Sequence, residues 1–139
     1  MSRSAVLLLS LLAAVVLDGC SVRTLVASKV GDALASGGAS WSTEDDPELV
    51  REALPFALKT MESLAAEAPQ HEGLRLALCR GYVGYAGGFL EPEAEALEAE
   101  SFERAKALRL RAERLYLRAL GYCRQALDLG FRGAGGELD

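Results

Sequence analysis

The fold of this chain follows from residues 45–69, whose sequence is DDPELVREALPFALKTMESLAAEAP. The stretch opens on a helix start signal. An aspartate caps the free amides, Pro47 suits the first helical position, and Glu48 complements the positive end of the helix dipole. Apolar residues then share one helical stripe, namely Val50, Ala53, Leu54, Ala57, Met61, Leu64 and Ala68. Pro55 lies inside this stripe and predicts a kink or a break, and Pro69 predicts the end of the helix.

A second helix is predicted to begin near residues 70–72, directly after Pro69. Its apolar residues recur at helical spacing as Leu74, Leu78, Tyr82, Tyr85 and Phe89. Glycines interrupt the same stretch at positions 81, 84, 87 and 88. Each glycine disfavours a helix by about 1 kcal/mol relative to alanine. Either the helix ends near Gly87, or another part of the molecule approaches its backbone closely there.

Residues 91–100 are acidic and rich in alanine, which is typical of a solvated helix or a helical connector. A long helix follows, with an apolar seam of Phe102, Ala105, Leu108, Ala112, Leu115, Ala119, Tyr122 and Ala126. Its other faces are basic, and the carboxylates of 91–100 or a partner protein can balance them. Gly130 is expected to cap the end of this helix. Since no alternating pattern of useful length occurs, the chain is predicted to be all α.

Near the N-terminus, Arg3 and the free amino group form a small positive region. A short apolar run begins at Ala5 and closes on Leu17-Asp18-Gly19-Cys20. This ending is similar to a bacterial lipobox, which predicts cleavage before Cys20 and a lipid on its sulfur. The residue after the cysteine is Ser21 and not the acidic residue that retains many lipoproteins in the inner membrane. We therefore expect the protein to be anchored in the outer membrane, facing the periplasm. The alternative is an ordinary secretory signal with a chance cysteine.

These signals divide the chain into three parts. Residues 1–19 are a predicted lipoprotein signal peptide. Residues 20–40 are a lipid-anchored segment with a short helix that ends near Ser36. Residues 41–139 are a helical domain large enough for one core.

The composition excludes several classes of function. The chain has 15 basic against 20 acidic residues, so a nucleic-acid partner is not expected. His71 is the single histidine, no metal-ligand cluster accompanies it, and it is expected at the surface or as a helix cap. No serine or cysteine has a recognisable catalytic partner, so we expect neither an enzyme nor a cofactor.

Two cysteines remain besides Cys20. Cys79 and Cys123 each sit in a helical pattern among apolar neighbours. We expect small buried free thiols, with a disulfide in an oxidising compartment as the alternative.

The order of residue sizes resembles a tetratricopeptide repeat (TPR). The small, large, apolar and terminating proline positions of one repeat fall on Ala57, Met61, Leu64 and Pro69. The apolar, small and aromatic positions of the next repeat's first helix fall on Leu78, Cys79 and Tyr82. Small residues let two helices approach, while aromatic residues fill the space between hairpins. The predicted fold is therefore an all-α helical hairpin array of TPR type.

A longer resemblance covers essentially the whole mature chain. The segments that carry it are 45–59, 61–64, Gly81-Tyr82 with Tyr85-Ala86 and Phe89, 102–105, and Cys20 followed by Ser36-Gly37-Gly38. Together they resemble the TatT family, TPR-type lipoprotein T-components associated with TRAP transporters. Members of that family run well past the end of this sequence. We therefore expect a fragment, or a short member that closes its open end by association into a homo-oligomer.

The resemblance implies a non-enzymatic periplasmic lipoprotein of a TRAP-type uptake system. Such a protein docks the periplasmic substrate-binding protein and holds a small hydrophobic ligand. Tyr82, Tyr85 and Phe89 are the candidate ligand-binding residues, because they form an aromatic stripe beside glycines. Ordinary core packing is the alternative for these three residues. For the whole protein the alternative is a general TPR scaffold lipoprotein that mediates protein–protein interactions in the cell envelope.

Overall fold

The computed structural model describes residues 22–36 and 43–135 of the chain. Every regular element in these two ranges is a helix, so the all-α prediction is confirmed for the described part of the chain. The predicted signal peptide, the lipid site Cys20 and the break after Ser36 lie outside the described residues.

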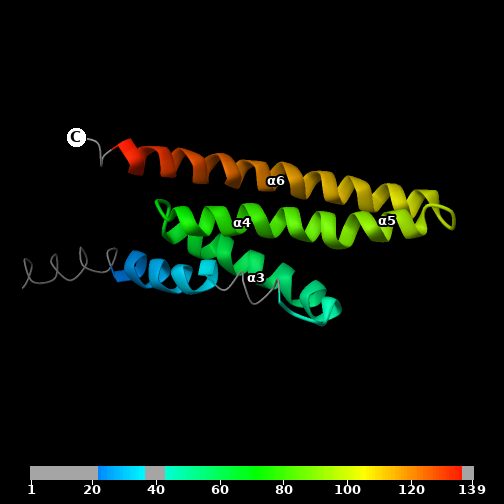
Figure 1. Cartoon of the computed structure of the whole chain (residues 1–139), viewed down its shortest axis with the longest axis horizontal. Coiled ribbons are helices and arrows are strands. Elements are labelled where there is room, and N and C mark those ends of the chain that lie inside the picture. Colours follow the sequence, from blue (N-terminus) through cyan, green and yellow to red (C-terminus); the bar gives the residue numbers. More distant parts are fainter. Residues whose placement is uncertain (1–21, 37–42, 136–139) are drawn as a thin grey trace, which may run out of the picture.

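One helix, α4, is the central element of the fold. In chain order the elements are a helix over 22–36, α3 (Pro47–Glu67), α4 (Glu72–Tyr85), the π-helix η1 (Ala86–Leu90), α5 (Glu91–Leu97) and α6 (Phe102–Gly135). Figure 1 shows α4 and α5 as one rod that lies alongside α6, with α3 on the other side of α4. The 22–36 helix packs near the turn between α3 and α4, where Gly31 lies against Leu74.

The start of α3 agrees with its sequence signal. The Asp46 carboxylate accepts hydrogen bonds from the amides of Glu48 and Leu49, at 3.0 and 3.2 Å, and Pro47 is the first helical residue. The helix ends just before Pro69, as predicted. It continues through Pro55, so of the predicted kink or break the break is excluded.

The glycines of the second helix do not end it. The backbone passes from α4 into η1 and on into α5 without interruption, as Figure 1 shows. Two of these glycines instead allow close approach. A Cβ added at Gly81 would lie 2.6 Å from Cδ2 of Leu58, and one at Gly87 would lie 2.9 Å from the Tyr116 hydroxyl. The second of the two predicted alternatives is therefore correct.

The core lies on both sides of α4, where this helix meets α3 and α6. Alanines recur on α6 at every seventh position and are all buried, namely Ala105, Ala112, Ala119 and Ala126. Their small side chains let α6 approach α4 closely, which is how a heptad seam joins two helices. The largest fully buried side chains are leucines, namely Leu58, Leu74, Leu78 and Leu90.

Two details of α6 differ from prediction. Phe102 is 59% exposed because it is the first residue of the helix, beyond the end of the seam. The helix also continues past Gly130 to Gly135. Gly130 lies beside Glu72, since an added Cβ would lie 3.1 Å from a carboxylate oxygen of that side chain.

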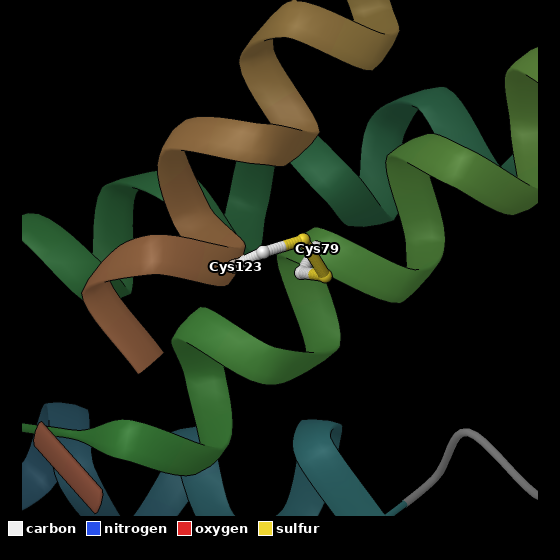
Figure 2. The surroundings of a disulfide bond; sticks show 2 residues. All are labelled: Cys79 and Cys123. Carbon is white, nitrogen blue, oxygen red and sulfur yellow. A yellow bond between two sulfur atoms is a disulfide. The ribbon is translucent and has the colours of Figure 1, made fainter. Parts of the chain in front are cut away.

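The two cysteines form a disulfide, which corrects the expectation of free thiols. Figure 2 shows the bond joining Cys79 of α4 to Cys123 of α6 across the helix interface. Their Cα atoms are 5.0 Å apart, although 44 residues separate them along the chain. Each cysteine has apolar neighbours in its own helix, but the register of α4 on α6 places them opposite each other.

The TPR-type repeat is not confirmed by this arrangement. Helix α6 alone has 34 residues. One complete TPR has about 34 residues but divides them between two helices. Among the described helices, none is long and apolar enough to cross a membrane.

Candidate functional site

A cavity of about 490 Å³ opens between α3 and α4. This volume lies within the range of roughly 300–1,000 Å³ that small-molecule sites occupy. Apolar side chains form most of its wall, namely Leu34, Ala35, Val50, Leu54, Met61, Leu76, Ala77 and Phe89. Among the described lining residues none is acidic, and the charged one is Arg80. Such a wall suits an apolar guest.

Glycines of α4 shape this cavity. At Gly81 the side chain of Leu58 approaches so closely that α3 and α4 are in direct contact. At Gly84, about one turn further on, an added Cβ would meet no heavy atom within 4 Å. Contact at one glycine and open space at the next leave room between the two helices, and the bare backbone forms part of the wall.

The three aromatic residues singled out by the sequence do not share one environment. Phe89 lines the cavity, whereas Tyr82 and Tyr85 are buried and are not among its lining residues. The ring of Tyr82 stacks on Tyr122 of α6, with centroids 6.1 Å apart. The guanidinium of Arg111, also on α6, lies 5.7 Å from the centroid of Tyr85. Both tyrosines therefore belong to the interface between α4 and α6.

The π-helix explains why Phe89 separates from this stripe. In an α-helix, residues four apart lie on one face, so Tyr85 and Phe89 would point the same way. The wider turn of η1 shifts Phe89 from the position that a regular α-helix would give it, and Phe89 lines the cavity. Its ring remains 5.6 Å from that of Tyr85, centroid to centroid, at an interplanar angle of 48°. A local departure from helical periodicity thus delivers one aromatic ring to the cavity.

Arg51 of α3 holds Phe89 in place from the other side. Its guanidinium lies 5.6 Å from the ring centroid and donates a hydrogen bond to the Phe89 carbonyl at 3.4 Å. It also bonds the carboxylate of Glu93 at 2.8 Å, and this hydrogen bond is the main cause of the raised pKa of Arg51. Because the cation is paired and stacked, it positions the ring and is not free for a ligand.

A separate polar cluster joins α3, α4 and α6 around Glu62. The Tyr122 hydroxyl donates to Glu62 at 3.0 Å, Arg118 lies 3.6 Å away, and Lys59 also pairs with this carboxylate. Burial opposes the ionisation of Glu62, but hydrogen bonds from Lys59, Tyr82 and Tyr122 outweigh it and lower its pKa. Burial, followed by the bond to Glu62, raises the pKa of Tyr122 to about 12. Every polar group has a partner, so the cluster is a structural clamp.

Sequence reasoning singled out Gly81 and Gly84 but missed the other residues of α4 that line the cavity, namely Gly73, Leu76, Ala77 and Arg80. Gly73, Ala77, Arg80 and Gly84 recur at intervals of three and four and form a second stripe on α4. The signal was present as helical spacing. This stripe is easily overlooked because it consists of small residues and an arginine. The large apolar residues, which are the usual sign of a buried face, form a different stripe on the same helix.

His71 caps α4, as predicted for a capping residue. Its Nδ1 accepts a hydrogen bond from the Leu74 amide at 3.2 Å. Its Nε2 lies 3.1 Å from the Ser28 carbonyl oxygen and 3.1 Å from a carboxylate oxygen of Asp32, so the ring also ties the 22–36 helix to the turn before α4. In the ranges that the structure describes, no group of three or more His, Cys, Asp or Glu residues lies close enough together to bind a metal ion.

Comparison with known proteins identifies the family. Residues 43–135 match the family described as TRAP transporter T-component. Over 93 residues the chain is 38% identical to an uncharacterised protein of Treponema pallidum (strain Nichols). This match covers 67% of the chain but 29% of that protein, so the chain spans less than a third of the relative's length. No solved structure is similar enough to count as a match. The chain belongs to the family of TRAP transporter T-components.

Proposed function

We propose that this protein is the T-component of a TRAP-type solute uptake system, where it holds a small hydrophobic ligand and docks the substrate-binding protein. The observation that carries the proposal is an apolar cavity of about 490 Å³ in a member of this family. Its volume and its mostly apolar wall suit a small molecule with little polar surface. The family is associated with transport and is not an enzyme family, which agrees with a role in handing over a ligand unchanged.

We place the protein in the bacterial cell envelope, anchored through a lipid on Cys20 in the outer membrane and facing the periplasm. The lipobox-like sequence before Cys20 supports this location. The disulfide between Cys79 and Cys123 supports it independently, because structural disulfides form and persist in oxidising compartments such as the periplasm. A T-component family is consistent with an envelope location as well.

The test is a pull-down of the tagged full chain from its own membranes, extracted with their lipids as nanodiscs so that detergent does not displace a ligand. Retained proteins and small molecules are identified by mass spectrometry. We expect a periplasmic solute-binding protein of TRAP type and an apolar small molecule.

Two glycine variants show whether the small molecule occupies the cavity. Gly84→Leu places a large side chain at the open side of the cavity, where it should obstruct entry, while Gly121→Leu makes the same change on α6, which contributes no lining residue. At both positions an added Cβ meets nothing within 4 Å, so both variants should fold. Gly84→Leu should lose the small molecule and Gly121→Leu should keep it. Recovery of envelope-assembly proteins without a solute-binding protein would instead favour the general scaffold function.

A further inference from the structure

Arg80 stands apart from the other residues around the cavity. Like Gly84, it is exposed although it lines the cavity, so it lies at the opening, and it is the charged one of the described lining residues. No carboxylate of the described residues lies within ion-pair distance of it. By contrast, Arg51 at the Phe89 end of the cavity is neutralised by Glu93. Arginines without an ion-pair partner among the described residues, such as Arg104, also occur on the outer faces of α6, but they border no part of this cavity.

The position of Arg80 restricts the charge of a guest. A cationic group at the opening would face this guanidinium, and no acidic residue lines the cavity to attract it. An anionic group deep among apolar side chains would lose its hydration without a partner, which is costly. At the opening, however, an anion keeps contact with water and gains two parallel hydrogen bonds from the guanidinium fork.

We propose that the ligand is an amphiphile whose apolar body fills the cavity between α3 and α4 and whose single anionic headgroup binds Arg80. This inference rests on the proposed function, since it names the class of ligand for the same cavity. A carboxylate and a phosphate monoester share the chemistry that a guanidinium recognises, so both headgroups belong to this class.

The experiment is calorimetric titration of the full chain in zwitterionic nanodiscs, with empty nanodiscs as the blank. The probes have one alkyl chain and different headgroups, namely octanoate, octyl phosphate, octanol and octylammonium. The two anionic probes distinguish a carboxylate source from a phosphate source. The variants are Arg80→Met, which keeps an apolar stem, Arg80→Lys, which keeps the charge without the fork, and the control Arg104→Met.

An anionic probe should bind the native protein more tightly than octanol, and octylammonium should bind most weakly. Arg80→Met should weaken the anionic probe roughly three- to tenfold, the size expected for a charge-assisted contact that stays partly in water. It should leave octanol unchanged, and Arg80→Lys should give an intermediate affinity. Added salt should weaken the anionic probe in the native protein and in Arg104→Met, but much less in Arg80→Met.

Two results would overturn the inference and separate it from the proposed function. If octanol binds as tightly as the anions and Arg80→Met changes nothing, the anionic headgroup is wrong while the cavity remains a site for a neutral guest. If no probe binds, or if Gly84→Leu leaves binding of the probes unchanged, the cavity is not the ligand site and the ligand-holding part of the proposed function fails as well.

Discussion

At the scale of single residues, Glu62 shows how one carboxylate can join three helices. Its side chain is 14% exposed, yet its pKa is lowered because hydrogen bonds from Lys59, Tyr82 and Tyr122, together with the charge of Arg118, outweigh the effect of burial. A buried carboxylate without such partners would be destabilising. The network thus gives α3, α4 and α6 a fixed relative position through groups that the core leucines do not supply.

We expect this cluster to make the stability of the protein depend on pH at the acid end. The pKa of Glu62 is lowered in the folded state from the ordinary value of 4.5. Its contribution is therefore present above about pH 4.5 and is lost as pH falls through the folded pKa. Glu62→Gln should reduce this loss. Urea unfolding between about pH 6 and about pH 3 measures it.

Glu52→Gln is the matched control for this prediction. Glu52 is an exposed residue of the same helix and pairs with no cation of the described residues. Its replacement should leave the acid dependence of the native protein in place. Equal acid dependence in native protein and Glu62→Gln would show that Glu62 contributes nothing to it.

At the scale of helices, the sequence predicts what depends on local chemistry. The cap at Asp46 and the alanine seam of α6 follow from residue type and spacing, and both are confirmed. What it does not predict depends on contacts between helices. Leu58, which is 2% exposed, is an exception, because the stripe assigned to α3 omits it although it lies four residues after Leu54 and three before Met61, on the same helix face. The separation of Phe89 from Tyr82 and Tyr85 requires a π-helix, which no periodicity of 3.6 indicates.

The disulfide belongs to the same scale, since it joins two helices at one point of their interface. It closes a segment of 44 residues that includes η1, α5 and the turn into α6. A cross-link of this kind restricts the unfolded chain, which typically stabilises a protein by about 2–4 kcal/mol. We expect the double variant Cys79→Ala, Cys123→Ala to lower the free energy of unfolding by that amount, as measured by urea denaturation.

A reductant supplies the control for the disulfide prediction. It should lower the stability of the native protein toward that of the double variant, and it should leave the double variant itself unchanged. A native protein equally stable with and without reductant would contradict the prediction.

At the scale of the whole molecule, helix α6 carries apolar side chains on two faces, one buried and one exposed. The buried seam faces α4, while a second set of apolar side chains is exposed, namely Leu110, Leu117, Leu120, Leu127 and Phe131. Their spacings of three, four and seven residues are those of a helix that packs against another helix. Within the described part of the chain no element covers them, since each is at least 44% exposed.

This exposed stripe predicts that the full chain associates with a second copy of itself through α6. A stripe with heptad-like spacing can pair with its own copy, because each apolar side chain enters the space between those of the other helix. We expect the double variant Leu117→Glu, Leu127→Glu to shift the protein toward monomer, since charges are then forced together in an apolar contact. Analytical ultracentrifugation of the full chain in mild detergent measures the shift. Phe56→Glu is the control, because Phe56 is 78% exposed on α3, away from the stripe. A native protein that is monomeric at all concentrations, or a double variant that associates as strongly as Phe56→Glu, would show that α6 does not join copies of this chain.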